Sequence, residues 1–283
     1  MKFAYYPGCV PHSLCRELLS STASVASQIG LTLVEIPQAA CCGAGYLNEK
    51  APNLGNVINA RTLALAERLN LDLVTGCSTC YGNLNVENNR LRNDTSLRNK
   101  ANSVLQEFKL EFQNGPTVRH IAEVFASSQI AECIREKSTV KLDGLRIVIF
   151  TGCHFIRPFP VNCDLDSFFT KLGAKVSSCD TWEKCCGFHT IFTHRKMSLG
   201  MVGDIIEAGA NSGGNAIVTL CPLCYIALDM FQGEARREGL CRHSLPVMHL
   251  PQAIGMAMGM SSRQLGLHKH INSMHSILNG LKT

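Results

Sequence analysis

The sequence predicts an α/β fold made of two tandem, duplicated lobes, each with a parallel sheet flanked by helices. Two observations predict it. Short apolar segments alternate with amphipathic ones along the chain, and cysteines recur at one spacing in both halves. Alternating strands and helices are typical of parallel sheets joined by right-handed crossovers. With 283 residues, 46% of them hydrophobic, the chain is long enough for two such cores.

The duplication is clearest in ten of the fifteen cysteines. The first set is Cys9, Cys41, Cys42, Cys77 and Cys80. Adding 144 to each number gives the second set, which is Cys153, Cys185, Cys186, Cys221 and Cys224. Both halves therefore contain Cys, 31 residues, Cys-Cys, 34 residues and Cys-x-x-Cys. A repeat of five specified positions indicates a duplicated structural unit.

The first lobe begins with a short apolar run that ends in Gly-Cys, as a strand leading into a loop would. Its strands are expected at 2–7, 31–36, 71–76 and 117–120. Amphipathic segments between and after these runs predict helices. These helices are expected at 13–29, 54–69, 80–91 and 98–112.

The second lobe repeats this order, which makes both lobes Rossmann-like. Its strands are expected at 145–151, 175–179, 215–220 and 246–249. Its helices are expected at 163–172, 196–211, 222–236 and 250–260. The organisation we expect is a first domain over 1–127, a linker over 128–144, a second domain over 145–260 and a C-terminal tail over 261–283. The tail is expected to pack as one more helix or to fray.

Composition excludes several classes of protein. The net charge of +5 is spread over the chain, without a basic tract interleaved with aromatic residues, so we expect no nucleic-acid partner. No apolar run reaches the roughly 18 residues of a membrane span, and the N-terminal residues lack the apolar core of a signal peptide. A cytoplasmic protein is therefore expected, in which cysteines serve as metal ligands or redox groups rather than disulfides.

The cysteines of each set are expected to meet at the carboxyl ends of the strands, where ligands gather in open parallel sheets. Cys80 lies one turn after Cys77 at a helix start, where free N–H groups stabilise thiolate charge. Zinc or a conventional cubane cluster needs four ligands and leaves a fifth unexplained. Five thiolates favour an iron–sulfur cluster with unusual ligation, or a four-ligand site plus one reactive cysteine. Zinc and a metal-free dithiol remain as alternatives.

The spacing resembles the cysteine-rich CCG domain, which is named for a sequence seen here as Cys41-Cys42-Gly43 and Cys185-Cys186-Gly187. Two such domains in one chain, with Pro7-Gly8-Cys9 and Cys221-Pro222-Leu223-Cys224, resemble the B-type subunit of heterodisulfide reductase. The resemblance covers about residues 1–260. CCG domains also occur in fumarate-linked, glycolate and lactate oxidoreductases, so the resemblance is specific for the domain and less so for the substrate.

The resemblance implies two noncubane [4Fe-4S] clusters, each held by one complete set of five cysteines, with a substrate cavity between them. It implies an oxidoreductase that acts on a disulfide, a thiol or protein-bound sulfur. The implied partners are a ferredoxin-like iron–sulfur protein of the family's C type and a flavoprotein of its A type. The first gap of the second half is shorter than in the archaeal pattern, which favours a bacterial sulfur-metabolising homologue.

Two histidines distinguish the second set from the first. His154 follows Cys153, and His189 occupies the position that corresponds to Gly45. We expect either imidazole to donate protons to a departing thiolate or to bind an anionic substrate; the alternative is an ordinary hydrogen bond to the backbone. Five cysteines have no partner in the repeat and are expected to be small buried side chains. They are Cys15, Cys133, Cys163, Cys179 and Cys241.

Two other functions remain open at this stage. The chain can be an electron-transfer or quinone-complex CCG subunit without substrate chemistry of its own. It can also be a sulfur carrier that uses Cys41 or Cys42 as a persulfide.

Overall fold

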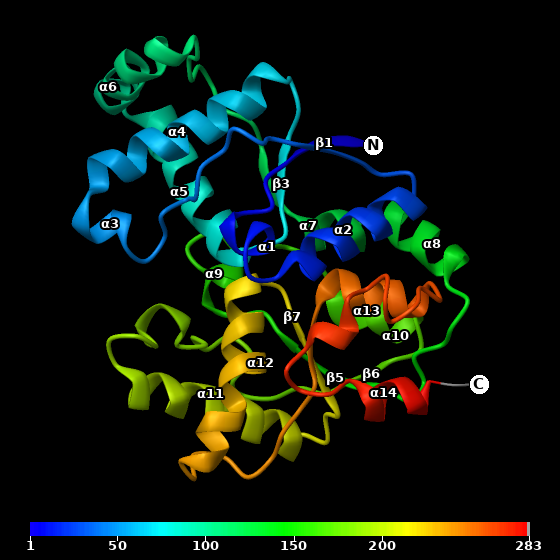
Figure 1. Cartoon of the computed structure of the whole chain (residues 1–283). Coiled ribbons are helices and arrows are strands. Elements are labelled where there is room, and N and C mark those ends of the chain that lie inside the picture. The colour runs from blue at the N-terminus through cyan, green and yellow to red at the C-terminus, as the bar shows by residue number, and fades with distance from the viewer. Residues whose placement is uncertain (282–283) are drawn as a thin grey trace.

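The computed structural model describes residues 1–281 and contains two parallel sheets, one in each half of the chain (Figure 1). The first sheet has the order β2-β1-β3-β4, and the second has the same order, β6-β5-β7-β8. The first sheet consists of β1 (Lys2–Tyr5), β2 (Thr32–Glu35), β3 (Leu73–Thr75) and β4 (Val118–His120). The second consists of β5 (Arg146–Phe150), β6 (Lys175–Val176), β7 (Ala216–Thr219) and β8 (Val247–His249). The α/β prediction of two duplicated lobes is confirmed.

Helices flank both sheets. Those of the first half are α1 (Cys9–His12), α2 (Arg16–Gln28), α3 (Leu47–Lys50), α4 (Pro52–Arg68), α5 (Ser78–Asn93), α6 (Thr95–Leu105), η1 (Gln106–Phe108), α7 (Ile121–Ala126) and α8 (Ser128–Lys137). Those of the second are α9 (Cys153–Ile156), α10 (Leu165–Lys171), η2 (Phe188–Thr190), α11 (Arg195–Asn211), α12 (Pro222–Arg237), α13 (Leu250–Ala257), η3 (Leu267–Lys269) and α14 (His275–Gly280).

Two segments differ from the sequence prediction, whereas the tail packs and contains a helix, which is one of its two expected states. The helix expected to reach residue 112 ends at Leu105, and a 3₁₀ turn then leads to Lys109 in the left-handed conformation. The expected linker contains helix α8, because Ile130 and Ile134 bury one face of it. The tail packs on the second lobe, with Met274 and Ile277 buried. Residues 282–283 of the predicted tail lie outside the described residues.

Helices of each lobe pack on the other lobe across the interface. Helix α13, which follows the last strand of the second sheet, packs on α2 of the first lobe, and Figure 1 shows the two side by side. Helix α7, its counterpart after β4, contacts α10 of the second lobe. Helices α5 and α9 also pack together, as do α1 and α12. The interface is therefore built twice by equivalent elements, as a pseudo-twofold arrangement of two repeats would build it.

A reciprocal pair of hydrogen bonds joins the carboxyl ends of the two sheets. His120 Nε2 lies 3.0 Å from the Leu220 carbonyl oxygen, and His249 Nε2 lies 3.0 Å from the Gly76 carbonyl oxygen. Each histidine ends a strand in one lobe and contacts the residue before a cysteine in the other. These bonds place the two Cys-x-x-Cys segments against each other. Within residues 1–281, no helix has the length and apolar character that crossing a membrane requires.

Candidate iron–sulfur site

The first cysteine set converges at the carboxyl end of the first sheet. Cys9 Sγ and Cys41 Sγ lie 3.4 Å apart, and Cys42 Sγ and Cys80 Sγ lie 3.5 Å apart. Cys77 is the N-cap of α5, and the Cys80 backbone N–H points at its sulfur with an N···Sγ distance of 3.4 Å. A helix start thus directs a free N–H group at thiolate sulfur, as the sequence predicts.

The second set repeats these contacts. Cys153 and Cys185 lie close enough to shift each other's pKa, as do Cys186 and Cys224. A backbone N–H again points at sulfur, from Gly187 to Cys185 with an N···Sγ distance of 3.4 Å. The spacing repeat in the sequence is therefore also a repeat of sulfur positions.

The two sets touch each other. Cys77 Sγ lies 3.6 Å from Cys221 Sγ, across the lobe interface. Thr79 Oγ1, from the first lobe, lies 3.4 Å from the same Cys221 sulfur. All ten repeated cysteines therefore form one continuous group rather than two isolated sites.

A glycine before each leading cysteine lets the backbone pass close to sulfur. Gly8 has φ 83° and ψ 174°, and Gly152 has φ 69° and ψ 175°. Only glycine commonly adopts this region. A Cβ at Gly8 would lie 3.2 Å from Cys80 Sγ, and one at Gly152 would lie 3.2 Å from Cys224 Sγ. Both positions therefore require glycine, because of the backbone conformation and because a Cβ would crowd a cysteine sulfur.

The sets are open on one side only. Cys9, Cys41 and Cys185 are exposed and Cys153 is half-buried, whereas the other six repeated cysteines are buried. Hydrogen bonds from Cys42 and Cys9 hold the pKa of Cys41 well below its usual range. The hydrogen bond to Cys41 raises the pKa of Cys9. Of the pair formed by Cys9 and Cys41, Cys41 is therefore the thiol whose pKa is lowered.

The donor chemistry fits iron–sulfur clusters. Each set offers five soft sulfur ligands, close backbone approach and N–H groups aimed at sulfur, which are the features that clusters use. The sulfurs lie in pairs rather than around one point. Among residues 1–281, no group of three or more His, Cys, Asp or Glu side chains is arranged to hold a single metal ion. The unmatched cysteines also form no disulfide: Cys15, Cys179 and Cys241 are buried, and Cys133 and Cys163 are half-buried.

Comparison with known proteins agrees with this geometry. Residues 3–85 and 147–229 each match the CCG family, described as a cysteine-rich domain. The chain belongs to the CCG family. The two matches coincide with the two lobes and contain all ten repeated cysteines. The resemblance to the B-type subunit of heterodisulfide reductase is therefore confirmed at the level of the family.

Curated CCG relatives match almost the whole chain. The chain is 34% identical to the 8-methylmenaquinol:fumarate reductase membrane anchor subunit of Wolinella succinogenes, covering 95% of this chain and 96% of the relative. It is 29% identical to the B-type subunit of a ferredoxin/F420H2-dependent CoB-CoM heterodisulfide reductase of Methanosarcina acetivorans, covering 95% and 93%. A hypothetical protein of Helicobacter pylori has the same fold, with a TM-score of 0.78 at 18% identity over 96% of this chain and 52% of that one.

His154 and His189 both lie against the first CCG lobe. A Cβ at Gly82 would lie 2.9 Å from His154 Nδ1, and one at Gly45 would lie 2.4 Å from His189 Nδ1. Burial lowers the pKa of His154, and its Nδ1 has no hydrogen-bond partner among residues 1–281. His189 is exposed beside Cys185. Both imidazoles therefore fill space at the open side of the sites, and their catalytic role stays a prediction.

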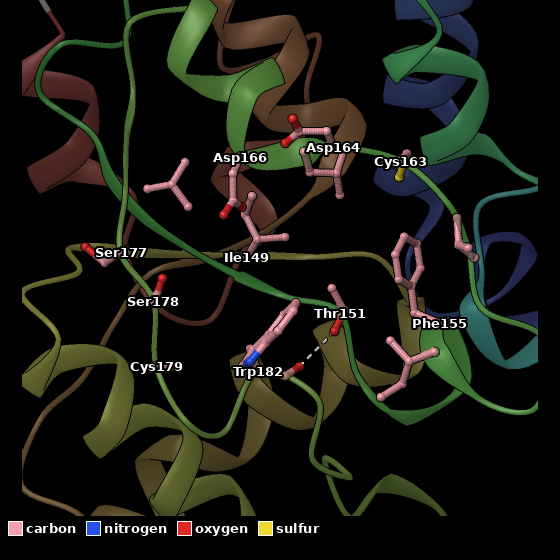
Figure 2. A pocket seen from close by; sticks show the side chains of 14 residues that line it. Ile149, Thr151, Phe155, Cys163, Asp164, Asp166, Ser177, Ser178, Cys179 and Trp182 are labelled. Atoms are coloured by element: carbon pink, nitrogen blue, oxygen red, sulfur yellow. Dashed lines mark hydrogen bonds between the residues drawn. The ribbon is translucent and has the colours of Figure 1, made fainter.

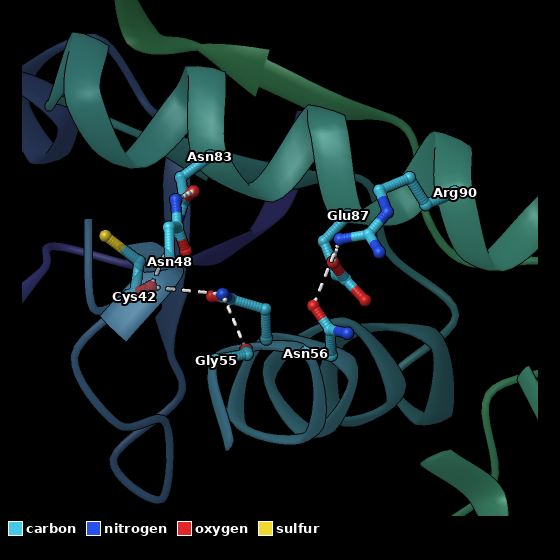
Figure 3. Close-up of polar contacts among 8 residues, drawn as sticks. Cys42, Asn48, Gly55, Asn56, Asn83, Glu87 and Arg90 are labelled. Atoms are coloured by element: carbon cyan, nitrogen blue, oxygen red, sulfur yellow. Dashed lines mark hydrogen bonds and ion pairs between the residues drawn. The ribbon is translucent and has the colours of Figure 1, made fainter. Parts of the chain in front are cut away.

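An asparagine network behind the first Cys-Cys pair was not foreseen from the sequence (Figure 3). Asn83 Nδ2 and Asn59 Nδ2 donate to the Cys42 carbonyl oxygen at 2.6 Å and 3.0 Å. Asn48 Nδ2 donates to Asn83 Oδ1 at 2.7 Å. The sequence does contain a signal for this network. The residues 144 positions after the three asparagines are Phe192, Gly203 and Ala227. The asparagines therefore occur in only one copy of the repeat.

A cavity of about 350 Å³ lies behind the second site (Figure 2). None of the ten repeated cysteines lines it. Thr151 Oγ1 donates to the Trp182 carbonyl oxygen at 3.0 Å, which closes the wall between the cavity and Cys153. Prolines 158 and 160 keep residues 157–164 non-helical. The first lobe has the long helix α2 at the corresponding position.

Proposed function

We propose that this chain is the catalytic iron–sulfur subunit of a heterodisulfide reductase-like complex. One noncubane [4Fe-4S] cluster would be held by each set of five cysteines. The observation that carries the proposal is the contact between the sets through Cys77 and Cys221, at 3.6 Å. A disulfide has two equivalent ends and needs two electrons, and a duplicated site with touching halves suits such a substrate.

When bound, the two clusters would supply one electron each to a disulfide, which with two protons becomes two thiols. The open side of the sites, at Cys9, Cys41 and Cys185, is where such a substrate would enter. His189 is exposed there and would supply a proton. His154 is kept neutral by burial, so its role in the proposal is to hydrogen-bond the substrate.

The partners in this proposal are a ferredoxin-like iron–sulfur protein of the family's C type and a flavoprotein of its A type, in the cytoplasm. The heterodisulfide reductase relatives are, by name, single subunits of such multisubunit enzymes. Two aromatic rings beside the open sites support a docked partner. Tyr46 is 67% exposed and Phe192 is 81% exposed, and each follows one of the Cys-Cys pairs. Exposed apolar surface of this kind is typical of interaction sites.

Iron content tests the proposal directly. Anaerobically purified protein is expected to contain about eight irons, as two four-iron clusters require. The double variants Cys41→Ser/Cys42→Ser and Cys185→Ser/Cys186→Ser are each expected to keep about four. Trp182 is the only tryptophan and lies near Cys185, so loading of the second site should quench its emission. About four irons in the unsubstituted protein, or zinc in place of iron, would refute the proposal.

A second candidate is electron transfer in a quinol-linked complex, without sulfur chemistry in this chain. It is favoured by the 34% identity to the membrane anchor subunit of a methylmenaquinol:fumarate reductase. Spectroscopy of the oxidised holoprotein with added thiol separates the two candidates. A thiol adduct on cluster iron supports the disulfide reaction, whereas an unchanged spectrum together with reduction by a menaquinol analogue supports the relay.

A further inference from the structure

The two cysteine sets differ in the groups that lie behind their Cys-Cys pairs. In the first lobe the Cys42 carbonyl oxygen accepts hydrogen bonds from Asn83 Nδ2 at 2.6 Å and Asn59 Nδ2 at 3.0 Å. Asn48 fixes the Asn83 amide by donating to its oxygen at 2.7 Å. Figure 3 shows these amides gathered around Cys42. Two N–H dipoles thus point their positive ends at a residue that carries a cluster sulfur.

The second lobe lacks this arrangement. The residues that correspond to Asn59 and Asn83 are Gly203 and Ala227. Neither of these residues has an amide side chain that could donate a hydrogen bond to the Cys186 carbonyl oxygen. A Cβ at Gly203 would lie 2.6 Å from the Leu240 carbonyl oxygen, so the packing of this lobe excludes a longer side chain there. The difference is therefore built into the fold of each lobe.

Burial makes the first-lobe dipoles effective. Asn59 is 2% exposed and Asn83 is 8% exposed, so water does not screen them. Hydrogen-bond donors around a cluster favour its reduced state, which carries more negative charge. The Glu87 carboxylate on the same helix opposes this effect, but Arg90 lies 3.3 Å from it and compensates its charge. The two amide dipoles at Cys42 therefore favour an added electron.

We propose that Asn59 and Asn83 give the first-lobe cluster a higher reduction potential than the second-lobe cluster. The inference deepens the proposed function and rests on it, because it requires one cluster on each set. A first electron that reaches the pair would then reside on the first-lobe cluster. The second electron would be held by the second-lobe cluster, beside His154 and His189. Unequal potentials let a pair of one-electron centres store an electron until the two-electron step.

The test is an anaerobic redox titration of the holoprotein followed by electron paramagnetic resonance. The two signals are assigned with the double serine variants described above. Asn83→Leu keeps the branched shape of the side chain, removes its amide and leaves Asn59 bonded to Cys42. It is expected to shift the first-lobe potential to a more negative value and to leave the second unchanged. Asn48→Ala, at an exposed position, releases the Asn83 amide and is expected to give a smaller shift of the same sign.

Asn85→Leu is the matched control, because Asn85 lies on the same helix but donates to the Tyr81 carbonyl oxygen at 3.1 Å. It is expected to change neither potential. The reciprocal variant Ala227→Asn introduces an amide behind Cys186 and is expected to raise the second-lobe potential. If Asn83→Leu fails to load iron, Asn48→Ala carries the test.

The inference is overturned if the first-lobe potential is the lower one, or if neither asparagine variant shifts it while about eight irons remain bound. Iron content separates this failure from failure of the proposed function. A protein with two clusters of equal, insensitive potentials refutes only the asymmetry. A protein that never binds two clusters refutes the function as well.

Discussion

Single residues decide how closely the backbone approaches the sulfurs. Gly8 and Gly152 precede the leading cysteine of each set, and both have positive φ with ψ near 175°. Side chains other than hydrogen are strained in this conformation by about 1–3 kcal/mol. They would also meet a cysteine sulfur at 3.2 Å. Sulfur position and backbone conformation therefore depend on the same two glycines.

On the proposal of one cluster in each cysteine set, Gly8→Ala is expected to remove the first-lobe cluster, lowering iron from about eight to about four, and to reduce the free energy of unfolding by about 1–3 kcal/mol. Iron analysis and urea denaturation measure the two effects. Gly30→Ala is the control, because Gly30 has φ 71° with nothing within 4 Å of its added Cβ. It is expected to lose stability but keep its iron. Equal iron loss in both variants would mean that crowding of Cys80 is not the cause.

At the scale of elements, the ends of β4 and β8 hold the lobes together. Each strand ends in a buried histidine whose Nε2 contacts a carbonyl oxygen of the other lobe at 3.0 Å. Burial lowers the pKa of His120 to about 3 and that of His249 to about 4. Both imidazoles are therefore neutral in the folded protein at neutral pH. Their contacts with the opposite lobe give both histidines a structural role.

The lowered pKa values predict acid sensitivity. Below about pH 6.5 the unfolded chain protonates both histidines while the folded protein keeps them neutral, so stability falls as pH decreases. The loss is expected to reach about 1.4 kcal/mol per pH unit for each histidine. Urea denaturation at pH 7 and pH 5.5 measures it. The variant His120→Gln/His249→Gln keeps an N–H donor without titrating and is expected to show a smaller loss; an unchanged loss would contradict the prediction.

At the scale of the whole molecule, the two CCG lobes pack against each other through helices of both lobes. Helix α13 of the second lobe covers α2 of the first, and α7 of the first contacts α10 of the second. Cys77 and Cys221 meet only where the two lobes touch. Helices α2 and α10 each pack partly on the other lobe, and the paired site requires both lobes.

Separated lobes are accordingly expected not to fold independently. Residues 1–127 alone should aggregate or remain partly unfolded, because α2 loses the helix that covers it. Coexpression with residues 128–283 should restore a soluble complex that elutes like the intact chain and binds iron. Size-exclusion chromatography with iron analysis checks both outcomes. A monomeric, cooperatively unfolding fragment of residues 1–127 would show that the first lobe folds without the contact between α13 and α2.

The hydrophobic pattern along the sequence predicted most of the fold. The eight strands in residues 1–281 lie within the expected ranges, because short buried parallel strands are nearly continuous apolar runs. Short helices such as α1 and α9, with four residues each, carry too little periodicity to be recognised. Helix α8 was taken for a linker because its apolar face is narrow and is buried only by tertiary contacts.

The sequence by itself determined the duplication, the order of elements and the ten cysteines, because each depends on spacing along the chain. Only the tertiary structure decided that the two sets touch, that His120 and His249 bind across the lobes, and that asparagine amides lie behind Cys42 alone. These features join residues 17 to 173 positions apart. Their proximity comes from the packing of one lobe on the other and from the volumes of glycine and alanine in the second lobe, which no local pattern records.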